Sequence, residues 1–186
     1  LMLPENLLLA GIVLLIGIEI VMRAPRGELA LALLAVTAAA AAAFWLYTTG
    51  AGAAPFPGHF SVTPATLLGK AVVLALAIPV LLISRDDFAA GPFHILLLSS
   101  LYGACLLLSS DSFLTLFLGL EIMSLPVYVL VLLAYQRAQS AEAALKYLVL
   151  GGAATAMLLM GASLLYGATG SLSTLVFAQG LGSADP

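Results

Sequence analysis

One carboxylate lies in the middle of an apolar stretch, and it is the residue of this chain whose position most directly indicates chemistry. Glu121 stands between Ser112 and Tyr135, a run long enough to cross a bilayer. A carboxylate at the centre of a membrane helix costs roughly 2.5–3.5 kcal/mol on insertion scales, so it normally faces a protein or water-lined interior and marks a path for protons or ions. The first functional hypothesis is therefore proton or ion handling.

A proline five residues after Glu121 strengthens this hypothesis. Pro126 has no N–H, so the carbonyl of Ile122 loses its helical partner and the helix is expected to kink there. In hydrocarbon the freed carbonyl must be satisfied by neighbours or water, which favours a hydrated pocket beside the carboxylate. The alternative is a simple packing kink, in which Ser124 satisfies the backbone and Glu121 is only tolerated.

A lysine near the start of the sixth apolar run is the second candidate. Lys146 follows Ser140 by six residues, which places it about 9 Å into its span at 1.5 Å per residue. Glu142 precedes it by four residues, the spacing of an ordinary ion pair on a helix surface. Spacing alone leaves both interpretations open: a buried functional lysine, or a Glu–Lys pair at the membrane interface.

Three other charged residues near the ends of apolar runs are expected to have ordinary roles. Glu5 is predicted at an interface, and Glu19 is predicted to pair with Arg23 at i+4. Lys70 lies about a turn inside its helix, where its long stem can reach the headgroups. None of the three is therefore predicted to be a functional site.

The elements that must position these residues follow from composition. The 186 residues are 63% hydrophobic and 8% charged, with a mean hydropathy of +1.18, whereas soluble domains carry about 25% charged residues. This predicts an all-α polytopic membrane protein, without the basic surface of a nucleic-acid-binding protein. Six runs are long enough to cross the hydrocarbon core: 4–22, 29–49, 65–84, 91–110, 112–135 and 141–167. Of the connecting loops, only 50–64 is long enough to hold structure of its own.

The sequence contains no candidate ligands for a redox cofactor or a metal ion. Cys105 is the only cysteine, so it forms no intrachain disulfide. His59 lies in a Pro/Gly-rich loop and His94 at a helix start, both placed like interfacial residues rather than ligands. No Cys/His cluster offers a metal or iron–sulfur site. We therefore expect no cofactor in this chain.

The arginines predict the orientation. Arg23 and Arg26 follow the first run, Arg85 the third and Arg137 the fifth, while the loops after the second, fourth and sixth runs carry no Lys or Arg. By the positive-inside rule, the odd-numbered helices run inward, which places the N-terminus outside. The sixth run is rich in Gly and Ala, which let helices approach closely, so it is expected to be an interior helix.

Two stretches carry a resemblance to a known family. Residues 118–130 read LGLEIMSLPVYVL, and residues 140–171 read SAEAALKYLVLGGAATAMLLMGASLLYGATGS. Together they resemble the N subunit of bacterial NADH:quinone oxidoreductase, respiratory complex I. The match is strong over roughly 99–171, whereas the first three helices fit only in length, number and the opening Leu-Pro-Glu. Related antiporter-like subunits share the glutamate, but the Glu-Ile-Met-Ser-Leu-Pro order and Lys146-Tyr147 favour the N type.

The resemblance implies a subunit that holds no redox cofactor and couples electron transfer elsewhere in the complex to proton transport. NADH, FMN, iron–sulfur clusters and quinone would bind other subunits, and the partners would be the other membrane subunits and the lipid bilayer of the bacterial inner membrane. Glu121 matches a glutamate that pairs with a lysine on helix seven of the family. Lys146 matches a lysine of the same half-channel, and Glu142 and Pro126 are carried as supporting residues. The chain alone would not be catalytic.

The family also implies a longer protein. Its members have about fourteen helices in two inverted repeats, so a chain with six predicted helices, opening at Leu1, is expected to be the N-terminal part of such a subunit, or a split gene. Residues 1–110 would hold helices one to four, and residues 111–186 helices five and six, with the first proton-channel repeat beginning at helix four. Glu121 and Lys146 differ in depth by roughly 10–15 Å, so they are not expected to pair directly. The alternatives are a subunit of a cation/proton antiporter or membrane-bound hydrogenase, and a structural membrane module.

Overall fold

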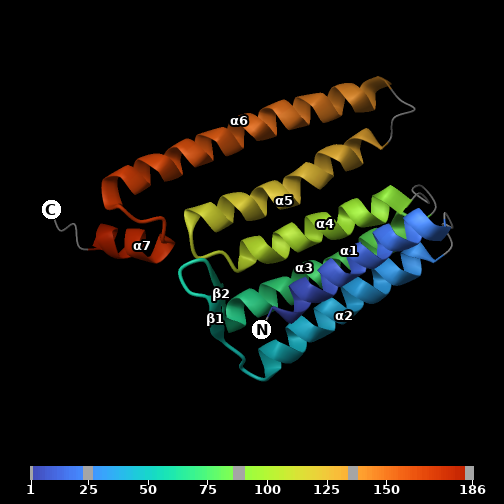
Figure 1. The fold of residues 1–186 in the computed structure, drawn as a ribbon, viewed down its shortest axis with the longest axis horizontal. Helices are drawn as coiled ribbons and strands as arrows, with labels where there is room; N and C mark the ends of the chain where they lie inside the picture. The colour runs from blue at the N-terminus through green and yellow to red at the C-terminus, as the bar shows by residue number, and fades with distance from the viewer. Residues whose placement is uncertain (1, 23–26, 86–90, 134–137, 183–186) are drawn as a thin grey trace.

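The computed structural model describes residues 2–22, 27–85, 91–133 and 138–182 as a set of long helices with one small hairpin (Figure 1). The helices are α1 (Leu3–Met22), α2 (Glu28–Thr48), α3 (Pro64–Ile83), α4 (Gly91–Leu108), α5 (Phe113–Leu132), α6 (Ala138–Thr169) and α7 (Thr174–Gly182). The strands are β1 (Ala53–Phe56) and β2 (Phe60–Val62), which pair antiparallel. Five helices are long and apolar enough to cross a membrane, and α4 is a shorter apolar helix. The prediction of a six-helix polytopic membrane protein is confirmed, with the hairpin and α7 added.

Local signals explain where two of these helices begin. Thr63 caps α3 and Ser112 caps α5, and each forms a reciprocal capping box with a threonine three residues later. The box satisfies backbone N–H groups that the first helical turn leaves without partners. Pro64 then occupies the first turn of α3, where a missing N–H costs nothing. The capping residues therefore fix where the hairpin gives way to α3 and where the α4–α5 turn gives way to α5.

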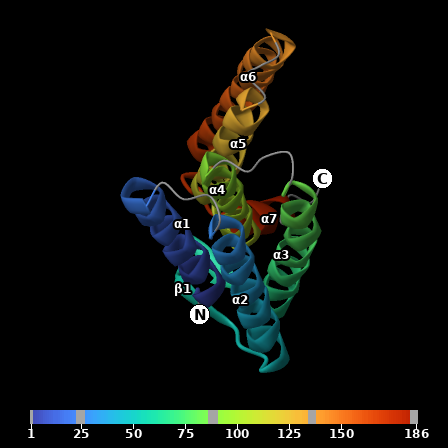
Figure 2. The same ribbon diagram turned by 90° about the vertical axis from the view of Figure 1, so that its right-hand side faces the viewer.

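The first four helices form a bundle with an apolar core, and Figure 2 shows them together below α5 and α6. Leu8, Leu15, Val36, Leu74 and Leu98 are fully or almost fully buried where α1, α2, α3 and α4 meet. Small residues at α2 positions such as Ala32 and Ala39 allow close helix approach. The bundle is thus a closely packed unit within the described part of the chain.

A polar network closes the end of the molecule that holds the hairpin. The Asp111 backbone N–H donates to the His59 carbonyl at 2.9 Å, and the Asp111 carboxylate accepts from the Ser61 hydroxyl at 2.9 Å. The Asp111 carbonyl accepts from both the N–H and the hydroxyl of Thr174, at 3.2 and 2.9 Å. The α4–α5 turn therefore joins the hairpin to the start of α7. The 50–64 connector does hold structure of its own, as its length predicted.

The helix α6 lies along α5, at the edge of the molecule (Figure 1). Over its most apolar 18 residues only 6% are buried, against 33% in α1 and α2. Small residues along it, including Gly152 and Gly161, face open space. Within the described residues α6 is therefore an edge helix, and its expected place in the interior stays a prediction.

Candidate functional site

Glu121 lies in the third turn of α5, half-buried, on the side that turns away from α4. Gly119 and Met123 face α4, and each is two positions from Glu121, which is about 200° around the helix. Leu125, Tyr128 and Leu132 follow Glu121 at the spacing of one helix face, and they line a groove between α5 and α6. The carboxylate therefore belongs to the face of α5 that is directed toward α6 and the open side of the molecule.

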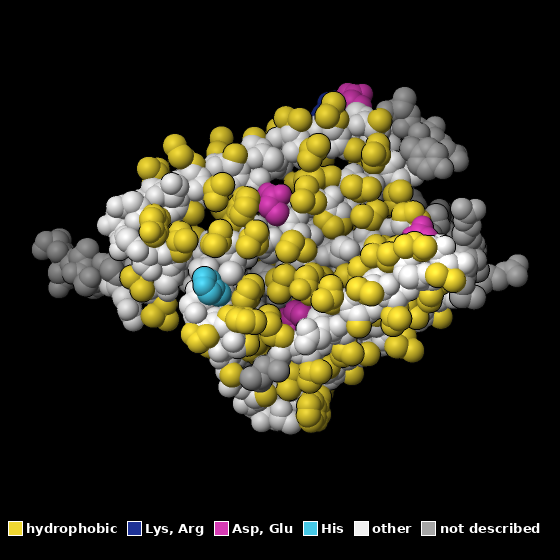
Figure 3. Space-filling model, in the orientation of Figure 1, with side chains coloured by type: hydrophobic (Ala, Val, Ile, Leu, Met, Phe, Trp, Pro, Cys, Tyr) yellow, Lys and Arg dark blue, Asp and Glu magenta, His cyan; other side chains and the backbone are white. Residues whose placement is uncertain are grey.

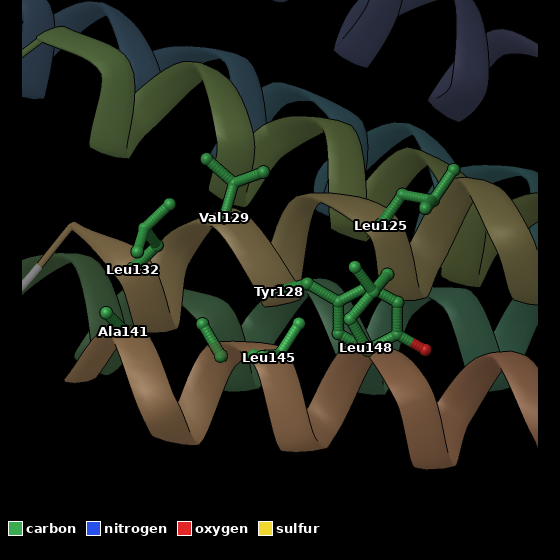
Figure 4. A pocket seen from close by; sticks show the side chains of 8 residues that line it. Leu125, Tyr128, Val129, Leu132, Ala141, Leu145 and Leu148 are labelled. Carbon is green, nitrogen blue, oxygen red and sulfur yellow. The ribbon is translucent and has the colours of Figure 1, made fainter. Parts of the chain in front are cut away.

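The groove beside this face is apolar. Its cavity volume is about 350 Å³, and Figure 4 shows Leu125, Tyr128 and Leu132 of α5 opposite Leu145 and Leu148 of α6. Within residues 2–22, 27–85, 91–133 and 138–182, no ion pair or hydrogen bond involves the Glu121 side chain. The groove supplies no counter-charge for Glu121 from the described parts of α5 and α6.

Pro126 lies inside the continuous helix α5, and its surroundings differ from the predicted alternative. In that alternative Ser124 satisfies the freed backbone, but its hydroxyl is buried and makes no hydrogen bond in the described structure. The hydroxyl that reaches this turn comes from α4, where Ser100 donates to the Met123 carbonyl at 2.9 Å. Glu121 therefore lies beside a turn of α5 that is contacted from a neighbouring helix.

Lys146 and Glu142 pair with each other on the outer surface of α6. The Lys146 Nζ lies 2.5 Å from the Glu142 Oε1, and the two side chains are 68% and 65% exposed. Of the two interpretations that the spacing allowed, the structure shows the Glu–Lys pair on the helix surface. The structure does not bring Lys146 together with Glu121, so the predicted site residues occupy two separate places.

Sequence reasoning missed a buried ion pair near the hairpin end of the bundle. The Lys70 Nζ lies 2.5 Å from the Glu5 Oε1, and the side chains are 0% and 2% exposed. The contact is not aligned as a hydrogen bond. The prediction that Lys70 reaches the headgroups is wrong, because its ammonium has a partner inside the protein, and the Glu5 side chain is buried against it. The signal was present: both residues lie in the first two turns of helices that enter from the same side.

A second polar pair lies at the other end of the bundle. The His94 Nδ1 is 4.0 Å from the Glu28 Oε2, and both side chains are about 4% exposed. His94 lies in the first turn of a helix as predicted, and its side chain is buried in the bundle. The apolar core of the bundle lies between the Glu5–Lys70 pair and the Glu28–His94 pair. Residues Arg23, Arg26 and Arg137, on which the orientation and the Glu19 pair depend, lie outside the described residues.

The surface and the titratable groups limit the chemistry of the described chain. Figure 3 shows a face that is mostly hydrophobic, with few charged side chains. No group of three or more His, Cys, Asp or Glu that could hold a metal ion is found among the residues with described positions. The features with chemical potential are therefore buried or membrane-embedded charges. Glu121 has no ion-pair or hydrogen-bond partner in the described chain, and neither has Glu19 of α1, whose predicted partner Arg23 lies outside the described residues.

Comparisons with known proteins show which family the chain resembles. The family model "NADH:quinone oxidoreductase/Mrp antiporter, TM" matches residues 110–182, which include α5, α6 and α7. The N subunit of NADH-quinone oxidoreductase from Pelobacter propionicus is 33% identical over 95% of this chain, and that from Paraburkholderia phymatum is 37% identical over 92%. The chain is similar to N subunits of bacterial NADH-quinone oxidoreductases. The resemblance read from its α5 and α6 sequences is confirmed.

Solved structures extend the similarity to the fold. A chain of respiratory complex I from Thermus thermophilus superposes with a TM-score of 0.82 and 32% identity over 92% of this chain. A chain of the archaeal membrane-bound sulfane sulfur reductase gives a TM-score of 0.74 at 25% identity. The chain spans 38% of each of these chains and 38% of the Pelobacter propionicus N subunit. The N-subunit likeness therefore covers almost all of this chain but well under half of its relatives.

Proposed function

We propose that this chain is part of a proton-translocating membrane subunit of NADH:quinone oxidoreductase, in which Glu121 relays protons and responds to the charge of its neighbours. The observation that carries the proposal is the position of Glu121: a carboxylate within a membrane helix, directed away from the packed bundle, without a counter-charge in the described chain. An isolated carboxylate in this setting is expensive, so it is expected where a proton or charge must act. The likeness to N subunits supports this assignment.

The proposal gives the other predicted residues defined roles. Lys146 is a coupling residue on the same proton path, Glu142 supports it from the same helix, and Pro126 shapes the turn that holds Glu121. A cation outside the described residues, in the remaining length that the relatives have, supplies the partner of Glu121. Residues 1–110 form the N-terminal helices, and the proton-channel repeat begins at α4 and continues through α5 and α6.

The surroundings follow from the same proposal. The chain holds no redox group, and NADH, FMN, iron–sulfur clusters and quinone bind other subunits of the complex. Its partners are the other membrane subunits, including antiporter-like neighbours, and it resides in the bacterial inner membrane with its N-terminus outside. The large exposed apolar surface of α6 is consistent with a helix that contacts further protein or lipid.

The test is a Glu121→Gln change in the native complex. Gln keeps the size of the side chain and removes its proton exchange, so we expect proton translocation to fall by about tenfold or more in assembled complex. Glu121→Asp should retain part of the activity. Glu19→Gln, which changes a half-buried acid on α1, is the matched control and should leave translocation unchanged. The readouts are proton uptake into vesicles and the amount of complex in the membrane.

Normal translocation by assembled Glu121→Gln complex would contradict the relay and favour a structural membrane module. Orientation is tested separately, by labelling a cysteine placed at the N-terminus from each side of the membrane. Labelling only from the cytoplasmic side would overturn the predicted topology without affecting the role of Glu121.

A further inference from the structure

The helices α4 and α5 touch backbone to backbone next to Glu121. A Cβ added to Gly103 would clash with the Met123 amide nitrogen and lie 2.6 Å from the Ile122 carbonyl carbon. A Cβ added to Gly119 would lie 2.9 Å from the Leu107 Cα. Both helices therefore use a glycine where they meet, and the peptide unit that joins Ile122 to Met123 is the point of closest approach.

A hydrogen bond fixes the next peptide of α5, which joins Met123 to Ser124, from the same face of α4. Ser100 precedes Gly103 by three residues, so both lie on one side of α4, and the Ser100 hydroxyl donates to the Met123 carbonyl at 2.9 Å. The neighbouring serine does something different: the Ser99 hydroxyl donates to the Ile95 carbonyl of its own helix at 2.8 Å. Of these two adjacent serines, Ser100 is the one that links α4 to α5.

This contact lies where α5 has least internal support. Pro126 gives the Ile122 carbonyl no N–H donor, and the buried Ser124 hydroxyl makes no hydrogen bond within the described chain. A helix turn that lacks an internal bond is easier to bend or rotate. An external hydroxyl and a close backbone contact at residues 122 and 123 limit that freedom one residue after Glu121.

We propose that Ser100 and Gly103 are positioning residues that set the orientation of Glu121 toward the proton path. They act through the backbone of α5: by holding one face of the helix against α4, they keep the opposite face, with the carboxylate, turned to α6. This inference rests on the proposed function of Glu121. It adds to that function the helix contact that determines where the carboxylate points.

The experiment compares Ser100→Ala, Ser100→Thr and Ser99→Ala in the intact complex, reconstituted in vesicles. The readouts are protons translocated per NADH oxidised and the amount of assembled complex. Ser100→Ala removes the bond between the helices, and we expect about a threefold fall in translocation per assembled complex, the size of a typical hydrogen bond between membrane helices. Ser100→Thr keeps the hydroxyl and should restore translocation. Ser99→Ala removes a hydroxyl of the same helix turn and should match the wild type.

Several results would overturn the inference. One is that Ser100→Ala and Ser99→Ala translocate equally well in assembled complex. Another is that Ser100→Ala lowers only the amount of complex, with protons per NADH unchanged, which is the result of a merely structural contact. Failure of Ser100→Thr to restore translocation would also contradict it, because the hydroxyl would then not be the cause. Gly103→Ala is a second variant, expected to lower translocation at least as much as Ser100→Ala.

The outcome separates this inference from the proposed function. If Glu121→Gln blocks translocation while Ser100→Ala does not, Glu121 is a relay whose orientation does not depend on α4, and only the inference fails. If Glu121→Gln leaves translocation intact, the proposed function itself fails.

Discussion

The bundle of α1 to α4 and the pair of α5 and α6 treat buried charge in opposite ways. In the bundle, Lys70 and Glu5 form a buried ion pair and His94 lies beside Glu28. In the α5–α6 pair, Glu121 has no partner among the residues described, and the ion pair that does form is exposed on α6. The fully buried charges of the bundle thus lie beside partners within it, whereas α5 and α6 present a charge and an apolar surface that further protein can complete.

The largest effect is expected from breaking the charge pair of the bundle. Glu5→Gln leaves the Lys70 ammonium buried without a counter-charge, which in protein interiors costs about 3–5 kcal/mol. We expect a clear loss of assembled subunit and a lower midpoint of thermal unfolding. The measurement is the midpoint and the membrane content of the complex carrying Glu5→Gln, compared with the wild type.

The double change is the control that identifies the cause. Glu5→Gln combined with Lys70→Met removes both charges and keeps similar volume, so stability should return close to that of the wild type. If the double variant is as unstable as Glu5→Gln alone, the pair is not held by its charges. The difference between the bundle and the α5–α6 pair would then not be a difference between paired and unpaired charges.

A smaller effect tests how α6 is held on α5. A Cβ at Gly151 would clash with the Tyr128 hydroxyl. The Tyr128 ring already packs edge to face on the Tyr147 ring, with 5.1 Å between the ring centroids. Gly151→Ala should therefore cost about 1–3 kcal/mol, the usual range for overpacking. Gly152→Ala is the matched control, since nothing described lies within 4 Å of its added Cβ. The measurement is the thermal midpoint of each variant in the intact complex.

The control also tests the contrast between the two regions. If Gly152→Ala is as damaging as Gly151→Ala, the outer face of α6 is covered in the complex by a closely packed helix. If both changes are harmless, the Tyr128 contact does not hold α6, and the described packing of α5 on α6 is wrong at this point.

The sequence predicted the two regions unequally, for a physical reason. Runs of about twenty apolar residues identify membrane helices because backbone groups must be satisfied internally in lipid, and the six long helices were found within a few residues. The Glu5–Lys70 pair was missed because its partners are 65 positions apart and each has a local explanation at an interface. Gly103 and Ser100 were missed because a glycine or serine in an apolar helix carries no sign of which neighbour it meets. The sequence predicts a role for Glu121 because a single carboxylate in a long apolar run has no local explanation.

The smallest structural effect is expected at the exposed pair on α6, where stability and function can be separated. An i,i+4 pair with both side chains about two-thirds exposed contributes about 0.3–0.5 kcal/mol. Glu142→Gln and Lys146→Met should therefore each shift the thermal midpoint only slightly. If Lys146 is a coupling residue, Lys146→Met should still lower translocation per NADH, and it should do so more than Glu142→Gln because Glu142 only supports it. Equal and normal translocation in both variants would make the pair a surface feature, and Glu121 would then be the single functional charge of the α5–α6 pair.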